Sequence, residues 1–193
     1  MRNPEHRVQT TKKLLRDALM TLLAEKSLRS ITVKELCARA ALNRSTFYAH
    51  YTDVYDLMAQ IEAEMKNDFF AALEPIFGSV GSMPPPKVTK KVFECIEANA
   101  DLCRATIGPY GDKEFGRNLL RETKKAITQS CTQYFPHADE WQINAYFTFI
   151  CGGCFALMER WIREGTVESS AVLADAAEKI MEGAAGFLLQ EPS

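Results

Sequence analysis

The chain has 193 residues, of which 47% are hydrophobic and 25% charged, values typical of a folded globular protein and not of a disordered one. Its formal net charge of −2 conceals two parts of opposite sign, because residues 1–52 hold ten Lys or Arg against four Asp or Glu, whereas residues 53–193 hold 13 against 21. A basic segment attracts polyphosphate and an acidic one is repelled by it, so only the first part suits contact with nucleic acid.

The first predicted helix covers about residues 8 to 26. Its apolar residues recur at helical spacing and form one stripe, consisting of Leu14, Leu15, Ala18, Leu19, Leu22 and Leu23.

A short second helix is predicted at about 32 to 39. Thr32 followed by Glu35 has the spacing of a capping box, which would satisfy free N–H groups at a helix start. One face of this helix is expected to be buried, and it carries Val33, Leu36, Cys37 and Ala40.

A third short helix is predicted at about 43 to 49, after a turn at Ala41 and with Asn43 as N-cap. Phe47 and Tyr51 are four residues apart and can pack inward together with Leu42. The outward face is then small, polar and basic, and it holds Asn43, Arg44, Ser45 and Tyr48. Side chains of these types read base edges in the major groove and hold phosphates. An ordinary helical hairpin with a solvated face would show the same spacing, so spacing alone leaves both interpretations open.

The segment of residues 10–58, with the core ITVKELCARAALNRSTFYAHY at 31–51, resembles the N-terminal domain of the TetR family of transcriptional regulators. The resemblance implies an all-α chain with a three-helix helix-turn-helix DNA-binding domain at 1–52 and a helical ligand-binding and dimerisation domain at 53–193. It also implies DNA contacts through Thr32, Asn43, Arg44, Ser45, Thr46, Tyr48 and His50. For His50 and Tyr48, a packing role is the alternative.

Three positions depart from the pattern of similar proteins. Ala41 stands where Gly is common, and in a left-handed conformation its Cβ would cost about 1 to 2 kcal/mol. Thr52 and Val54 stand where Lys is common, so phosphate anchoring at the start of the fourth helix would depend on main-chain N–H groups. Ser45 also replaces a common Gly, which adds a hydroxyl.

A fourth, long helix is predicted to begin at Asp53, because apolar residues then recur every fourth position, namely Leu57, Ile61, Met65, Phe69 and Leu73. The segment Gly78 to Pro86 contains three consecutive prolines and predicts an extended connection. Further helices are predicted near 87–99, 101–107, 113–134, 138–163 and 168–189. Sustained two-residue alternation is absent, which supports an all-α fold.

The segment 147–180 resembles the C-terminal dimerisation segment of one TetR subgroup. Small residues there would allow two helices from each of two copies to approach closely, and we expect the homodimer contact to involve Gly152, Gly153, Ala156, Trp161, Ile180, Ala184 and Leu188. Packing within one chain is the alternative. A two-fold dimer predicts a near-palindromic double-stranded DNA operator, with half-site centres about 34 to 36 Å or a multiple apart.

The second part is also expected to accept a small apolar or amphipathic effector between its helices. The candidate lining residues, each of which could equally be core, are Phe93, Ile96, Tyr110, Phe115, Leu119, Trp141, Tyr146 and Phe149. The resulting hypothesis is a dimeric repressor that an effector releases from DNA. The alternatives are an activator or regulator controlled by a protein partner, a helical interaction module, and a thiol-based redox protein.

Other functions find little support in the residue pattern. Cys151 and Cys154 form C-x-x-C, but within a predicted helix and not after a strand. His6, His50 and His137 show no metal-ligand spacing, and neither a nucleophile elbow nor a phosphate-binding loop is present. We therefore expect no enzyme, no cofactor and no metal. An N-terminal secretory signal is not recognisable, and the uncharged stretch Trp141 to Met158 falls short of a membrane span, so a cytoplasmic location is expected.

Overall fold

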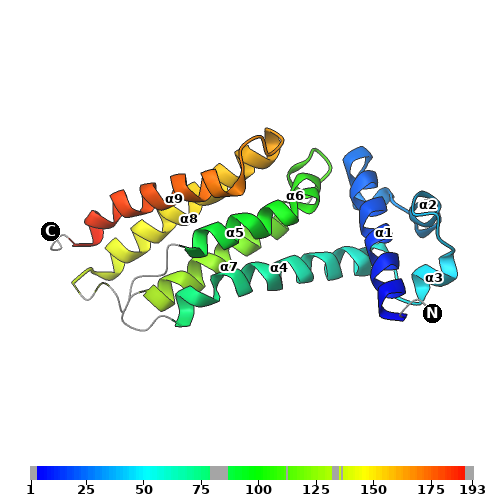
Figure 1. The fold of residues 1–193 in the computed structure, drawn as a ribbon, viewed down its shortest axis with the longest axis horizontal. Helices are drawn as coiled ribbons and strands as arrows, with labels where there is room; N and C mark the ends of the chain where they lie inside the picture. Colours follow the sequence, from blue (N-terminus) through cyan, green and yellow to red (C-terminus); the bar gives the residue numbers. More distant parts are fainter. Residues whose placement is uncertain (1–3, 79–86, 112, 132–134, 136, 190–193) are drawn as a thin grey trace. The chain divides into compact units, whose positions relative to one another are not determined.

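The computed structural model describes residues 4–78, 87–111, 113–131, 135 and 137–189, and these residues form helices and no strands, which confirms the all-α prediction. The elements (Figure 1) are α1 (Pro4–Glu25), η1 (Leu28–Ser30), α2 (Val33–Arg39), α3 (Arg44–Tyr48), α4 (Val54–Gly78), α5 (Lys87–Ala98), α6 (Ala100–Ile107), α7 (Glu114–Cys131), α8 (Glu140–Arg163), α9 (Ser170–Ala185) and η3 (Gly186–Leu189). Apart from Gly78, the predicted proline-rich connection lies outside the described residues.

The chain forms two compact units. The first unit comprises Met1–Glu64 and Asp101–Lys113, and the second comprises Met65–Ala100 and Glu114–Ser193. Helix α4 therefore begins in the first unit and continues into the second. The division into functional domains at residue 52 remains a prediction.

Helix α1 supplies much of the core of the first unit. Leu15, Leu19 and Leu22 are fully buried, and Ala18 and Leu23 are nearly so. This spacing is that of one helix face, as the sequence predicted. The prediction was wrong for Leu14, which is 40% exposed, because it lies about 100° around the helix from Leu15.

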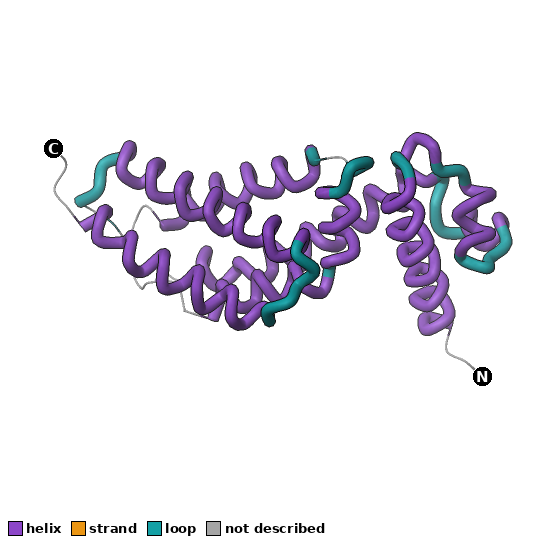
Figure 2. The backbone as a smooth tube through the Cα atoms, turned by 90° about the horizontal axis from the view of Figure 1, so that it is seen from above, coloured by secondary structure: helices purple, strands orange, loops and turns teal. Residues whose placement is uncertain are grey.

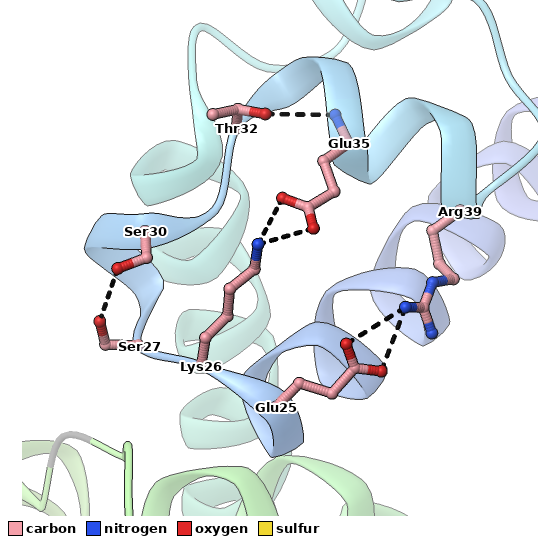
Figure 3. Close-up of polar contacts among 7 residues, drawn as sticks. All are labelled: Glu25, Lys26, Ser27, Ser30, Thr32, Glu35 and Arg39. Carbon is pink, nitrogen blue, oxygen red and sulfur yellow. Dashed lines mark hydrogen bonds and ion pairs between the residues drawn. The ribbon is translucent and has the colours of Figure 1, made fainter.

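Helix α2 begins as the sequence predicted. The hydroxyl of Thr32 accepts a hydrogen bond from the backbone N–H of Glu35 at 3.2 Å. The Glu35 carboxylate, however, does not complete the predicted capping box, since it accepts both of its short contacts, each 2.6 Å, from the Nζ atom of Lys26 (Figure 3). Glu35 therefore joins α2 to the end of α1, while Thr32 provides the cap.

The turn between α2 and α3 is a left-handed C-cap of the Schellman type. The backbone N–H of Leu42 donates to the carbonyl of Cys37 at 2.9 Å, and that of Ala41 donates to Ala38 at 3.3 Å. This pattern places a left-handed residue at Ala41, whose φ is +54°. An alanine here pays a steric cost that glycine avoids.

Ala41→Gly is expected to raise the free energy of unfolding by about 0.5 to 1 kcal/mol, because relief of the Cβ clash exceeds the entropy that glycine adds to the unfolded chain. Urea unfolding followed by circular dichroism measures this difference. The control is Ala38→Gly, at an exposed position inside α2, which should lower stability by about 1 kcal/mol. A loss of stability in Ala41→Gly would contradict the strained turn.

A partly buried ion pair joins α1 to α6 within the first unit. The guanidinium of Arg16 donates to both carboxylate oxygens of Asp101, at 3.0 Å and 2.9 Å. Burial raises the pKa of Asp101, but the hydrogen bonds from Arg16 and from the backbone N–H groups of Leu102 and Asp101 outweigh it, so the net pKa lies below its usual value. The bidentate pair thus favours the ionised carboxylate.

We expect Asp101→Asn to lower the free energy of unfolding at pH 7 by about 1 to 2 kcal/mol, a value reduced because the pair is partly exposed. A carboxyl group whose pKa falls on folding stabilises the protein above its unfolded pKa of about 3.9 and loses this contribution as the pH falls through the folded value. The difference between wild type and variant should therefore shrink as urea titrations move from pH 7 to about pH 3. Asp175→Asn, which breaks the exposed pair with Lys179, is the control and should change stability by less than about 0.5 kcal/mol. A difference that stays constant with pH would contradict this role.

The second unit is a bundle of helices that lie side by side (Figure 2). In it α5 packs against α9, α7 against α8, and α8 against α9. Helix α8 starts with a complete capping box, in which Asp139 and Gln142 exchange hydrogen bonds of 2.7 Å and 2.9 Å between side chain and backbone.

Helix α4 has the buried apolar face that the sequence predicted, formed by Leu57, Ile61, Met65, Phe69 and Leu73. Among the described helices, none has the length and apolarity that crossing a bilayer requires.

Candidate nucleic-acid interface

The short helix α3 is held by aromatic side chains on its inner face. Phe47 is fully buried and Tyr51 is 5% exposed, and their ring centroids lie 5.6 Å apart. This confirms the predicted inward pair. Tyr48 packs edge-on against Phe47, at 5.5 Å between centroids, yet keeps 58% of its surface exposed. The anchored inner face fixes which side chains of α3 point outward.

The outer face of α3 has the predicted polar character. Asn43 occupies the N-cap position in an extended conformation, but its side chain makes no capping hydrogen bond, contrary to the expectation that the amide would cap the helix. The residues predicted to contact DNA divide by burial into two groups: Thr32, Asn43, Arg44, Ser45 and Tyr48 are exposed, whereas Thr46 and His50 are half-buried. An amide, a guanidinium and two hydroxyls are thus presented together on and beside one helix, a set suited to reading base edges and holding phosphate.

Several basic residues of the first unit are engaged within the protein. Lys26 pairs with Glu35 and Arg39 with Glu25, the latter at 3.1 Å (Figure 3). Lys12 and Arg16 also have acidic partners, Glu64 and Asp101. Because these charges are balanced locally, they contribute less to attraction of DNA than the sequence suggested.

Among the described residues before α4, the exposed cations without an ion pair are Arg7, Lys13, Arg29, Lys34 and Arg44. Of these, the sequence analysis named only Arg44. The sequence could have identified Lys34 as unpaired on its own helix, because no acidic residue lies three or four positions away from it there. Cations free of protein partners can neutralise phosphates and release counterions.

Two carboxylates lie at the start of α4, where the sequence analysis considered phosphate contact through main-chain N–H groups. The Asp53 carboxylate accepts from the backbone N–H of Asp56 at 2.8 Å, and the Asp56 carboxylate accepts from the backbone N–H of Thr52 at 2.8 Å. The hydrogen bond from the Thr52 backbone N–H, together with those from the Gln60 amide and the Thr52 hydroxyl, lowers the pKa of Asp56. The two carboxylates therefore engage the N–H groups of Thr52 and Asp56, and their negative charge opposes phosphate binding at this helix start.

The residues predicted to line an effector site do not all come together. The second unit contains a pocket of about 140 Å³, and Phe93, Ile96 and Leu119 line it. Phe115 and Tyr146 are outside this lining, and the Tyr146 hydroxyl donates to the carbonyl of Met181 at 3.0 Å. Three further candidates are at least half exposed, namely Tyr110, Trp141 and Phe149.

The residues predicted to form the dimer contact also separate into two groups. Gly153, Ala156 and Ile180 are exposed, and Gly152 and Ala184 are half-buried. Trp161 and Leu188, in contrast, belong to the interior of the chain itself. Trp161 is 2% exposed and donates its indole N–H to the carbonyl of Glu168 at 2.9 Å, while Leu188 packs in a cluster with Ile143 and Phe147.

The thiols have the properties of packing residues. Burial raises the pKa of Cys37 and Cys154, and that of Cys95 to about 11. Thiolate is the reactive form, so burial makes these three thiols less reactive. The described residues contain no group of three or more His, Cys, Asp or Glu placed to hold a metal ion.

The geometry defines a class of protein, a DNA-binding regulator with a helix-turn-helix fold. Residues 85–183 match a family model described as "Transcriptional regulator C-terminal region". A 69-residue stretch is 26% identical to the uncharacterized HTH-type transcriptional regulator YxbF of Bacillus subtilis (strain 168), and this stretch covers 36% of the chain and 18% of YxbF. The chain thus corresponds to less than a fifth of that relative's length.

Two solved structures are similar in fold over nearly the whole chain. The fatty acid degradation regulator FadR from Bacillus halodurans superimposes with a TM-score of 0.64 at 12% identity, covering 95% of this chain and 97% of FadR. A TetR-family transcriptional regulator from Streptomyces coelicolor gives a TM-score of 0.57 at 14% identity, covering 96% and 81%. With the family match, these likenesses place the protein: the chain belongs to the TetR family of transcriptional regulators.

Proposed function

We propose that the protein is a dimeric repressor that binds a near-palindromic operator through α3 and is released by a small-molecule effector. The observation that carries this proposal is the outer face of α3, where Asn43, Arg44, Ser45 and Tyr48 are exposed above a buried Phe47. Thr32, Thr46 and His50 are assigned supporting contacts to the DNA backbone. No catalytic step is part of this function.

Dimerisation is proposed through an apolar face on α8 and α9 that this chain leaves uncovered. Phe149 is 70% exposed and Ile180 is 58% exposed. Gly152, Gly153 and Gly183 have open space above them, since a Cβ added at any of these glycines would meet no atom within 4 Å. Two large apolar side chains beside small residues suit close packing of helices from a second copy.

The effector is proposed to enter the pocket of the second unit and to favour one of two conformations of the dimer. Such control requires different affinities for the two conformations, because a ligand that binds both equally shifts nothing. The similarity to FadR of Bacillus halodurans supports the fold of this unit, and the choice of effector depends on the pocket of this chain.

A gel-shift assay with the DNA that flanks the protein's own gene tests the proposal. A fragment holding the operator should shift in preference to unrelated DNA, and its affinity should fall steeply with salt concentration. Equal binding to all fragments, or no shift even in dilute buffer, would overturn it.

A further inference from the structure

The pocket of the second unit has walls from several helices and an almost wholly apolar lining. Phe69 comes from α4, Phe93 and Ile96 from α5, Leu119 from α7, and Ile150 from α8. All five side chains are less than 9% exposed. This part of the lining thus belongs to the bundle core, and a ligand against it would lose much of its contact with water.

The described side chains that line the pocket include none that is charged; the polar ones are two threonines and two cysteines. The hydroxyl of Thr123 already donates to the carbonyl of Leu119 at 2.7 Å. Cys151 is buried and Cys154 half-buried, and a thiol is only a weak donor and acceptor. A charged ligand group would find no counter-ion in this lining.

Two physical terms then select the ligand. Burial of apolar surface is favourable by about 25 cal/mol per Å², whereas burial of an unpaired carboxylate or ammonium is strongly unfavourable. Size adds a second limit. An apolar protein cavity of about 150 Å³ accommodates benzene, and this pocket measures about 140 Å³.

We propose that the pocket binds neutral hydrocarbons of about the size of a single aromatic ring and rejects carboxylates and amines of the same shape. The preference for neutral over charged ligands depends only on the residues that line the pocket. The further claim that such a hydrocarbon acts as effector rests on the proposed function.

The test is isothermal titration of the full chain with toluene, and with benzoate and benzylamine as charged probes of similar shape. At pH 7, toluene should bind saturably and at least about tenfold more tightly than either charged probe. A crystal treated with xenon should show the gas between α5, α7 and α8. Benzoate or benzylamine binding as tightly as toluene would overturn the proposal.

Two variants connect binding to this pocket. Val92→Phe adds volume at a half-buried lining position and should weaken toluene binding at least about tenfold. Val167→Phe makes the same exchange at a position that is 79% exposed, and it should bind toluene as the wild type does. If Val92→Phe does not fold, the smaller change Cys154→Leu replaces it. Unchanged toluene affinity in a folded filling variant would place the ligand elsewhere and overturn the proposal.

A gel shift with and without toluene separates this inference from the proposed function. Toluene that binds in the pocket and releases the operator supports both. If the protein binds the operator but does not bind toluene, the inference about the pocket is overturned and the proposed function as a regulator stands. Toluene binding without a shift of any promoter fragment overturns the regulator, while the pocket's preference for neutral ligands stands.

Discussion

Arg44→Ala is expected to weaken binding to the operator by about 1 to 3 kcal/mol for each half-site, while binding to unrelated DNA falls much less. Arg44 is exposed on α3 and, among the described residues, forms no ion pair, so its guanidinium is available to donate two hydrogen bonds to base acceptors in the fork geometry that favours guanine. Competition gel shifts with specific and random duplexes measure the ratio of the two affinities. Because an operator holds two half-sites, that ratio should fall at least about thirtyfold.

Two further variants distinguish reading of bases from general attraction. Tyr48→Phe removes a hydroxyl from an exposed ring and should weaken binding to all sequences alike, because a phosphate contact carries no base information. Arg121→Ala removes an exposed cation from α7 in the second unit and should leave both affinities unchanged. An Arg44→Ala protein with the wild-type affinity ratio would show that α3 is not the reading element.

Ile180→Glu is expected to dissociate the proposed dimer. Ile180 is 58% exposed in the single chain, and in a two-fold contact the substitution occurs twice on the same surface. Burying two unpaired carboxylates should weaken association at least about hundredfold. Sedimentation equilibrium measures the change directly, and operator affinity should fall with it because the two half-sites are no longer linked.

The matched controls for this prediction separate charge from position. Ile180→Leu keeps the apolar character and should remain dimeric. Val167→Glu introduces the same charge at a side chain that is 79% exposed and lies outside the proposed face, and it should also remain dimeric. A monomeric wild type, or an Ile180→Glu protein that still dimerises, would show that copies associate through another surface or not at all.

The course of the helices was predictable because local signals agreed with tertiary packing. Leucine spacing predicted α1, the pattern from Leu57 to Leu73 predicted α4, and Thr32 and Asp53 marked helix starts that the structure confirms. The small errors have local causes. Glu35 formed an ion pair with Lys26 and not a capping box, a choice that depends on the chain nine residues earlier.

The roles of apolar side chains were much less predictable. Phe149 and Trp141 have the same apolar character as Phe93, yet they are 70% and 68% exposed whereas Phe93 is 3% exposed. Periodicity identifies the apolar face of a helix, but it does not say which helix covers that face. The same limit explains why Trp161 was assigned to a dimer contact, although it packs against Phe93 inside its own chain, at 6.3 Å between ring centroids.

The two carboxylates that cap α4 bear on how the protein is distributed in a cell. Asp53 and Asp56 occupy N–H groups at the start of α4, and four cations of the first unit already have acidic partners. These pairs reduce, without removing, the sequence-independent attraction that holds such proteins on bulk chromosomal DNA, because Arg7, Lys13, Arg29, Lys34 and Arg44 are exposed and, in the part of the chain that the structure describes, form no ion pair. For a protein that binds an operator as proposed, weaker retention on the rest of the chromosome would leave a larger share of the molecules free to search for that operator.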